Sequence, residues 1–382
     1  MSKNSKSVWR IELRNYRALR NVSWQLRDGV HVVVGPNGSG KTTLLDAIGL
    51  FGEMLRRGPA AAFAVRGSHN LVHWQAAHDT SVLLGLAVDD AKWSIGVRPD
   101  RASIASWPTE SAYLGTAQLY AKDQGQSEFE LDNEKLHSNN DLALVVARRL
   151  GRSAPIESIG KAFESIAIFP ELAAAAWDLK ALRRSGSEAN GDMTLSTDGI
   201  NVFTVLRNWR DKRATRAQHD RVLAGLREAF PGIIEDWEFE TAGQTVAMIF
   251  VGGTDGNKRI RPREIADGVF HWLLNAVAVA GSADGGLVAI DEPERGQHPF
   301  AELQWLQFCR FEAGLRNLRI VLTTHSPVLL DGMREQPENV WLLDGSDKPQ
   351  PRSARDAIDP AWLAQFGLGE LYARNWLVKQ GT

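Results

Sequence analysis

The amino-acid sequence predicts an α/β protein that combines an N-terminal antiparallel β-subdomain, a parallel core sheet and an inserted helical lobe. Alternating runs such as Val8–Leu13 are typical of half-buried antiparallel strands. Two short runs with apolar centres, Leu287–Ile290 and Arg319–Thr324, are typical of buried strands in a parallel sheet. A glycine-rich loop at 35–40 follows a β-branched run and precedes an apolar segment with helical spacing, so it connects a strand to a helix.

Length and composition limit the class of protein. The chain has 382 residues, enough for two or three domains or for one large domain with an insertion. Its 44 basic and 46 acidic side chains exclude a globally basic protein that coats nucleic acid, but they allow a local basic patch. The single cysteine, Cys309, excludes an internal disulfide and an all-cysteine metal site. The sequence shows neither a signal peptide nor an apolar stretch of about 18 residues, so we expect a cytoplasmic protein without a membrane partner.

The first hundred residues are predicted to form strands, one long helix and a hairpin. The Asp28–Gly29 pair indicates a turn before the strand His31–Val34. A helix should cover Thr43–Leu55, where apolar residues recur at helical spacing. The other expected strands are Val8–Leu13, Val22–Leu26, Ser81–Val88 and Lys92–Val97.

The rest of the chain divides into an insertion, a second part of the core and a C-terminal segment. We assign residues 1–100 and 235–345 to the core, 101–234 to a mainly helical inserted lobe, and 346–382 to a helical segment packed on the core. The helices expected in the lobe are Asp141–Leu150, Pro155–Phe163, Leu172–Arg184 and much of Asn201–Phe230. In the second part of the core we expect strands at Trp237–Glu240 and Thr245–Val251 and helices at Asp267–Ala280 and Phe300–Leu315.

The loop that joins the first core strand to its helix has the spacing of a phosphate-binding loop. Gly-Pro-Asn-Gly-Ser-Gly-Lys-Thr at 35–42 fits the pattern G-x-x-x-x-G-K-[ST], although a glycine-rich turn alone would bind nothing. Its glycines let successive N–H groups point at phosphate oxygens, and the helix N-terminus adds its positive end. Lys41 would supply a mobile charge for the β- and γ-phosphates of ATP, and the Thr42 hydroxyl would bind Mg²⁺. The residues expected to hold the nucleotide are Gly35, Pro36, Asn37, Gly38, Ser39, Gly40, Lys41, Thr42 and Thr43.

Two later strands lead into side chains that complete such a site. Leu287–Ile290 leads into Asp291 and Glu292, at the edge of the sheet where α/β proteins bind ligands. Asp291 would hold Mg²⁺ through water, and Glu292 would orient and deprotonate the attacking water. The next strand leads into His325, which can hydrogen-bond the γ-phosphate. Taken separately, the carboxylates are also typical of a solvated strand edge and the histidine of a cap or a core, but the order of the motifs favours the functional interpretation.

Together these segments resemble the ABC-type ATPases of the SMC/RecF group, and more closely the short AAA-family, OLD-like ATPases of bacteria. The likeness covers most of the chain and is thin between Arg101 and Leu195. Residues 35–46 look like the Walker A loop and helix of the family. The other similar segments are Leu13–Arg17, Ser196–Asn201, Asp291–Glu294 with His298–Pro299 (Walker B and D-loop), Thr324–Pro327 (H-loop) and Phe366–Tyr372.

The resemblance implies a P-loop ABC-type ATPase head that uses ATP and Mg²⁺ and shares two sites across a head-to-head dimer. The signature loop of one subunit would face the Walker motifs of the other. Here that loop should be Ile265–Gly268, with Asp267 and Gly268 binding the nucleotide in trans. Ala266 stands where the family usually has a serine that bonds the γ-phosphate, and losing that charge-assisted hydrogen bond costs about 1.5–3 kcal/mol, so turnover should be slow. Gln75 is a candidate for the Q-loop glutamine.

The function implied by the resemblance is an ATP-hydrolysing subunit whose dimerisation drives or gates a partner effector, a nuclease or toxin of an anti-phage or toxin–antitoxin operon. One alternative is a RecF-like repair or recombination ATPase that binds DNA, and another is a slowly hydrolysing ATP-bound scaffold, suggested by Ala266. The long insertion and the altered signature disfavour a transporter subunit. The sequence has no sustained heptads for an SMC-type arm, and the segment after His325 is too short for the nuclease domain of OLD nucleases.

Two groups of basic side chains are candidates for contact with DNA or RNA, which would be salt-dependent. The alternatives are a solvated face paired with acidic residues and, for the second group, a cation that reaches the nucleotide of the partner subunit. The first group, on a predicted helix, is Arg207, Arg210, Lys212, Arg213 and Arg216. The second, just before the signature loop, is Lys258, Arg259, Arg261 and Arg263.

Overall fold

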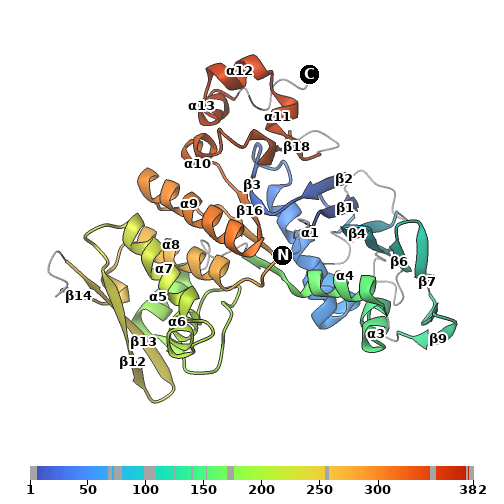
Figure 1. The fold of residues 1–382 in the computed structure, drawn as a ribbon, viewed down its shortest axis with the longest axis horizontal. Coiled ribbons are helices and arrows are strands. Elements are labelled where there is room, and N and C mark those ends of the chain that lie inside the picture. The colour runs from blue at the N-terminus through green and yellow to red at the C-terminus, as the bar shows by residue number, and fades with distance from the viewer. Residues whose placement is uncertain are drawn as a thin grey trace, which may run out of the picture.

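The computed structural model describes residues 7–67, 71–72, 80–98, 109–123, 125–138, 141–151, 153–169, 176–253, 258–344, 350–375 and 377. Figure 1 shows the N-terminal β-subdomain on one side, a helical lobe on the other, and the core sheet with the C-terminal helices between and above them. Helices cover the sheets, which confirms the predicted α/β fold class. None of the helices within these ranges is long and apolar enough to cross a membrane.

The N-terminal subdomain is a six-stranded antiparallel sheet in the order β2-β1-β4-β5-β6-β7. Buried and exposed residues alternate along much of β2 because one face of the sheet packs on the apolar interior. The strands are β1 (Trp9–Tyr16), β2 (Leu19–Leu26), β4 (Val82–Val88), β5 (Ala91–Val97), β6 (Thr109–Leu114) and β7 (Ala117–Lys122).

The sheet continues past the predicted core boundary at residue 100, because β6 and β7 belong to it. The buried Glu110 makes β6 hard to recognise, since an acidic residue at an inward position interrupts the apolar alternation. Its carboxylate accepts hydrogen bonds from the Trp93 indole at 2.8 Å and from the Tyr120 hydroxyl at 2.9 Å. The prediction of a mainly helical segment is therefore wrong for 109–137, which also contains β8 (Glu128–Leu131) and β9 (Glu134–His137).

The core sheet has the order β10-β15-β16-β3-β17-β18, and its first five strands are parallel. Both faces are buried, since Val32 and Ile290 belong to one apolar cluster and Val33 and Ala289 to another. A strand from the predicted insertion, β10, pairs with β15, so the assignment of all of 101–234 to a separate lobe is also wrong there. The strands are β3 (Gly29–Val34), β10 (Ile166–Phe169), β15 (Leu287–Asp291), β16 (Arg319–Thr323), β17 (Val340–Leu342) and β18 (Arg352–Ser353).

Helices pack against both faces of the core sheet (Figure 1). On one face, α1 (Lys41–Arg57) lies between the core sheet and the N-terminal sheet, together with α4 (Ala154–Glu164). The other face is covered by α8 (Asp267–Ala280) and α9 (Pro299–Arg316). Two short helices complete this part, α2 (Pro59–Ala64) and α3 (Ala143–Arg149).

The helical lobe has a small sheet of its own, with the order β11-β13-β12 and with β14 paired to β13. The hairpin of β12 and β13, predicted as part of the core, belongs to this lobe because β13 pairs with β11. Its inward side chains Val246, Met248 and Phe250 are buried in the same apolar cluster as α8. The elements are α5 (Ala176–Ser185), β11 (Ser187–Glu188), α6 (Val202–Asp211), α7 (Arg216–Ala229), β12 (Asp236–Ala242), β13 (Thr245–Gly252) and β14 (Lys258–Ile260).

The C-terminal residues form β18 and three short helices beside α10 (Pro327–Gly332), at the top of Figure 1. Leu368 and Leu371 are buried in the apolar cluster that includes α10 and α9. This contact fixes the C-terminal helices against the segment that comes after β16. The helices are α11 (Ala354–Ala357), α12 (Pro360–Gln365) and α13 (Leu368–Ala373).

Candidate functional site

The phosphate-binding loop turns sharply from β3 into α1 because its glycines adopt conformations that other residues avoid. Gly38 and Gly40 have φ values of +80° and +98°. A Cβ atom at Gly35 would lie 2.2 Å from the carbonyl oxygen of Leu343, so this position has no room for a side chain. The glycine spacing in the sequence therefore corresponds to real backbone requirements of the loop.

The loop also presents groups that suit phosphate oxygens. Ser39 Oγ is buried and has no hydrogen-bond partner among the described residues. Asn37 and Gly38 are exposed at the tip of the loop, and the 17-residue α1 begins immediately behind it. A buried hydroxyl without a partner, next to the positive end of a long helix, fits an anion. These residues therefore fit the phosphates of ATP.

Lys41, the first residue of α1, is almost completely buried. Its Nζ donates hydrogen bonds to the carbonyl oxygens of Gly35 at 2.9 Å and Pro36 at 3.1 Å. Burial lowers the pKa of the Lys41 ammonium, while Asp291 and Glu292 raise it by favouring the charged form. The ammonium is thus held inside the loop, where a phosphate group would replace the two carbonyl oxygens as its partner.

The two predicted magnesium ligands lie side by side. Thr42 Oγ1 donates a hydrogen bond to Asp291 Oδ2 at 3.2 Å, although the residues are far apart in the sequence. Asp291 is paired with Thr323 across β15 and β16, and the Thr323 hydroxyl donates to Asp291 Oδ1. Hydroxyl and carboxylate oxygens are the ligands that Mg²⁺ prefers, so the donor set fits this ion. Thr323 was not predicted from the sequence, where it is one of two threonines ending a strand.

Glu292 follows β15 with a left-handed backbone conformation, φ +47°. Such a conformation costs a non-glycine residue about 1–3 kcal/mol and tends to occur at functional sites. The Glu292 N–H donates to the carbonyl oxygen of Thr323 at 3.1 Å and to its hydroxyl at 3.2 Å, which holds the turn. The Glu292 side chain is 43% exposed, and its Oε1 lies 3.8 Å from Nε2 of His325. A half-exposed carboxylate beside the magnesium ligands is placed to act as a general base.

His325 is held from two directions. Its backbone N–H donates to Glu294 Oε1 at 2.9 Å, and its Nδ1 lies 2.6 Å from the hydroxyl of Tyr372. Burial lowers the pKa of the His325 ring, Lys41 lowers it further, and Glu292 acts in the opposite direction, as does Asp291. The lowered pKa favours the neutral form of the ring. The sequence predicts no role for Glu294 or Tyr372 beyond their place in segments that resemble the family.

Known proteins match the chain in separate segments. A family described as "AAA ATPase domain" matches residues 8–82, and one described as "AAA domain, putative AbiEii toxin, Type IV TA system" matches residues 177–331. A DNA replication and repair protein RecF from Actinobacillus pleuropneumoniae is 30% identical over 95 residues, which is 24% of this chain and 24% of that protein. The Escherichia coli protein named "Retron Ec83 probable ATPase" is 33% identical over 96 residues, 24% of this chain and 16% of that protein. The match thus spans a quarter or less of these curated relatives.

Among solved structures, an SMC head bound to the C-winged helix domain of ScpA has a similar fold. The alignment covers 91% of this chain and 99% of that chain, with a TM-score of 0.52 and 12% sequence identity. These matches support the predicted resemblance to ABC-type ATPases of the SMC/RecF group. The closer resemblance to OLD-like ATPases stays a prediction.

The predicted signature loop, Ile265–Gly268, leads into α8. Ala266 is the N-cap residue and makes no capping hydrogen bond with its side chain. Gly268 packs against the segment after Walker B, since a Cβ atom there would lie 2.4 Å from the carbonyl oxygen of Gly296. The predicted signature loop therefore contacts the predicted D-loop segment of the same chain.

Arg183, on α5, holds the signature loop and was not predicted from the sequence. Its guanidinium donates to the carbonyl oxygen of Pro262 at 2.7 Å, to that of Ile265, and to the carboxylate of Asp267. The hydrogen bond from Arg183 lowers the pKa of Asp267. Asp267 was expected to bind nucleotide in trans, and here its side chain is engaged by Arg183. The partners lie 84 residues apart, so no local pattern could have indicated the contact.

Two segments that resemble the family meet at Asp46 on α1. Its carboxylate accepts hydrogen bonds from the Tyr16 hydroxyl at 2.5 Å, from Arg17 at 2.9 Å and from Arg66 at 2.8 Å. Burial, followed by the charge and hydrogen bond of Asp46, raises the pKa of Tyr16. The end of β1 is thus fastened to the helix that carries Lys41.

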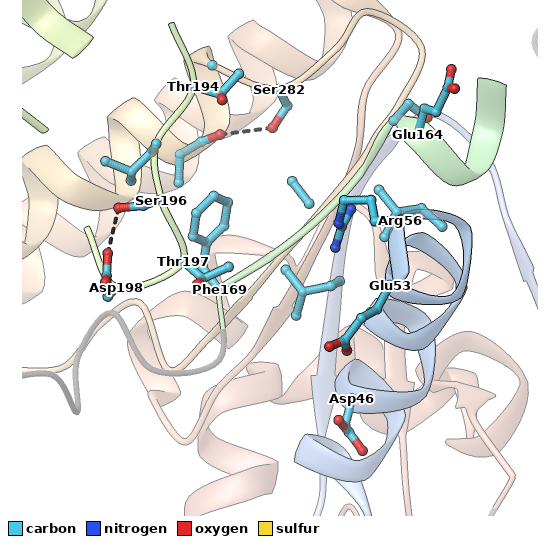
Figure 2. Close-up of a pocket in the computed structure, with 18 of the residues that line it drawn as sticks. Asp46, Glu53, Arg56, Glu164, Phe169, Thr194, Ser196, Thr197, Asp198 and Ser282 are labelled. Carbon is cyan, nitrogen blue, oxygen red and sulfur yellow. Dashed lines mark hydrogen bonds between the residues drawn. The ribbon is translucent and has the colours of Figure 1, made fainter. Parts of the chain in front are cut away.

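We call the edge of the core sheet at which β3, β15 and β16 end the candidate catalytic edge. A cavity of about 1070 Å³ lies beside it, between α1 and the helical lobe. Of the residues expected to hold the nucleotide only Thr42 and Thr43 line it, and Asp291 and Glu292 do not. Figure 2 shows Asp46, Glu53 and Arg56 of α1 on one wall and the loop 194–198 on the opposite wall. That loop belongs to the mid-chain segment similar to the family, and its shape is held by a 2.5 Å hydrogen bond from Ser196 Oγ to Asp198.

Both basic groups lie in the helical lobe, and several of their side chains have local partners. Arg210 pairs with Asp211 at 3.0 Å and lies over the Phe239 ring, and Arg259 pairs with Glu238 at 2.5 Å. Nucleic-acid contact by these groups stays a prediction. Gln75, the candidate for the Q-loop, lies outside the described residues.

Proposed function

We propose that this protein binds and hydrolyses ATP, dimerises head-to-head when ATP is bound, and in this way drives or gates a protein effector. One observation carries the ATPase part of this proposal. Lys41, the Thr42–Asp291 pair, Glu292 and His325 converge where β3, β15 and β16 end, although they come from three distant segments. Ligands bind at this edge of an α/β sheet.

The residues at this edge have separate roles in phosphoryl transfer to water. The loop N–H groups and Lys41 bind the phosphates, while Thr42 and Asp291 hold Mg²⁺. Bound Mg²⁺ supplies positive charge against the β- and γ-phosphate oxygens. Glu292 orients a water molecule and accepts its proton, a contribution of about 10²–10⁴ in rate. His325 donates a hydrogen bond to the γ-phosphate from Nε2.

Dimerisation completes the site in this proposal. The start of α8, with Gly268, presents backbone N–H groups that would cap the phosphates bound by the other subunit. Ala266 has no hydroxyl to add to them, so we expect slow turnover from the chain alone. The SMC head of similar fold is bound to a domain of ScpA, which supports a protein partner for such a head.

Two comparisons and one surface support the proposed kind of effector. The retron ATPase and the family described with an AbiEii toxin support an anti-phage or toxin–antitoxin role. Rows of exposed large apolar side chains are uncommon on monomeric proteins and support a protein partner. Such a row lies along α9, at Phe300, Leu303, Phe311 and Leu315.

A RecF-like DNA-binding role is the second candidate, because RecF proteins are among the relatives and because exposed cations such as Arg213 and Lys258 remain on the lobe. Its test is binding of duplex DNA by the isolated chain at low and high salt, with and without ATP. Binding that requires ATP and weakens with salt supports this role. No binding at low salt excludes it and leaves the effector-gating role or the ATP-bound scaffold.

The ATPase proposal is tested by phosphate release and by binding of a fluorescent ATP analogue. We expect magnesium-dependent release by the wild type, and release at least about 100-fold slower by Glu292→Gln with unchanged binding. Glu228→Gln, an exposed position on α7, is the matched control and should behave as wild type. A wild-type protein that binds no nucleotide, or a Glu292→Gln variant that hydrolyses ATP normally, would contradict the proposal.

A further inference from the structure

Within the ranges that the structure covers, Tyr372 is the one side chain that hydrogen-bonds the His325 ring. The Tyr372 hydroxyl lies 2.6 Å from Nδ1, and the two ring centroids are 6.3 Å apart. The other ring nitrogen, Nε2, faces the Glu292 carboxylate at 3.8 Å. The His325 ring thus lies between the C-terminal segment and the candidate catalytic edge.

The position of Tyr372 is fixed by the packing of α13 on α10, which lie together in Figure 1. The Gly369 N–H donates to Asp331 Oδ1 at 2.7 Å. A Cβ atom at Gly369 would lie 2.1 Å from the carbonyl oxygen of Pro327, and one at Gly367 would lie 2.4 Å from Asp331 Oδ1. Two glycines therefore allow α13 to approach the segment just after His325, and this approach delivers the Tyr372 hydroxyl to the ring.

We propose that Tyr372 is a positioning residue for His325: its hydroxyl donates to Nδ1 and so leaves the proton of the neutral ring on Nε2, directed at the candidate catalytic edge. A neutral imidazole has one donor and one acceptor nitrogen, so the bond at one fixes the role of the other. The inference rests on the proposed ATPase function, in which Nε2 donates to the γ-phosphate.

The charged groups around the ring agree with this assignment. Burial raises the pKa of Tyr372, and Glu294 and Glu292 raise it further, so the phenol keeps its proton. Lys41 and Asp291 are the other charges that act on His325, whose pKa is lowered chiefly by burial. The Glu292 carboxylate, 3.8 Å from Nε2, favours a proton on that nitrogen, which leaves Nδ1 to accept from the phenol. The C-terminal helix thereby contacts the nucleotide site through one hydrogen bond, which removal of a hydroxyl would break.

The tautomer can be read directly by NMR of nucleotide-free protein containing ¹⁵N-labelled histidine. The chain has 9 histidines, and the spectrum of His325→Gln identifies the signals of His325. We expect wild-type His325 to be protonated on Nε2, and Tyr372→Phe to move its ¹⁵N shifts toward a mixture of tautomers. Tyr113→Phe, on β6 in the N-terminal sheet, is the control and should leave them unchanged. Identical His325 shifts in wild type and Tyr372→Phe would overturn the proposal.

Turnover provides the second readout. Losing one neutral hydrogen bond should lower kcat for Tyr372→Phe by about 2- to 12-fold, with KM within about twofold of wild type. In a His325→Ala background the same change should have no further effect, because Tyr372 acts through that ring. An equal loss of kcat in both backgrounds would show that Tyr372 does not act through the His325 ring. If the wild type has no ATPase activity, the proposed function fails while the NMR result still decides the role of Tyr372.

Discussion

The helices α1 and α8 both begin at a loop that the sequence predicts to bind nucleotide, but their N-termini present different chemical groups. α1 follows a loop whose glycines, Gly38 and Gly40, adopt left-handed conformations and leave Ser39 Oγ without a partner among the described residues. α8 follows a loop in which Ala266 provides no capping bond and the Asp267 carboxylate is held by Arg183. The N-terminus of α1 can bind an anion with groups that all come from one chain. The N-terminus of α8 lacks a hydroxyl, so in the proposed dimer it would offer only backbone groups to the nucleotide of the other subunit.

The largest effect should come from removing the charge at the first of these termini. Lys41→Ala replaces the ammonium that is hydrogen-bonded to the loop carbonyls. Two charge-assisted hydrogen bonds to phosphate at about 1.5–3 kcal/mol each predict that ATP binds at least about 100-fold more weakly. Titration with a fluorescent ATP analogue measures this, with Lys161→Ala as an exposed lysine control. Unchanged affinity would mean that the loop does not bind the phosphates.

A hydroxyl at position 266 should give the start of α8 the side chain that the family usually has in its signature loop. Ala266→Ser should raise kcat at least about tenfold, since one charge-assisted hydrogen bond is worth about 1.5–3 kcal/mol. The serine should also cap α8 and raise the free energy of unfolding by about 0.5–2 kcal/mol. Steady-state phosphate release and urea unfolding separate the two effects. Greater stability without faster turnover would show that Ala266 does not face a nucleotide.

Substitution of Gly268 tests a close packing contact, and substitution of Gly38 tests a left-handed backbone conformation. At Gly268 an added Cβ would lie 2.4 Å from the Gly296 carbonyl oxygen, so Gly268→Ala should lower the free energy of unfolding by about 1–3 kcal/mol. At Gly38 nothing lies within 4 Å of an added Cβ, and the cost is that of φ +80°, about 1–2 kcal/mol. Urea denaturation of both variants tests this. A neutral Gly268→Ala variant would contradict the contact between the signature loop and the D-loop.

The smallest effect concerns the ion pair at the second terminus. Arg183 lowers the pKa of Asp267 below its usual 3.8, so this contribution is present above that pH and is lost as pH falls through the lower folded value. The Asp267 carboxylate is 76% exposed, so solvent screening limits the pair to about 0.2–1 kcal/mol. Arg183→Met should therefore reduce unfolding free energy more at pH 7 than at pH 2. The same deficit at both pH values would assign the effect to the backbone contacts of Arg183 alone.

The success of prediction from the sequence depended on whether the signal was local. The phosphate loop is recognised from eight adjacent residues, and Asp291 and Glu292 are recognised from the apolar strand directly before them. The strand β6 could not be found in this way because Glu110 is buried and satisfied by Trp93, Tyr120 and the N-terminus of α3, which only the folded chain brings together.

The same reason applies within the site. Tyr372 reaches His325 because α13 packs on α10, and Arg183 reaches Asp267 because α5 lies against Pro262–Glu264, just before α8. Neither residue has a spacing in the sequence that points to its partner. The family resemblance marked the segment of Tyr372 but gave no contact for it.

ATP should join two of these chains, and the mass of Glu292→Gln measured by light scattering tests this most directly. This variant retains Lys41, Thr42 and Asp291 but lacks the base, so it should accumulate the ATP-bound form. We expect a monomer without nucleotide and a dimer, or a larger assembly, with ATP and Mg²⁺, and no such change for Lys41→Ala. A Glu292→Gln protein that binds ATP and keeps the same mass with and without it would contradict the ATP-gated dimer.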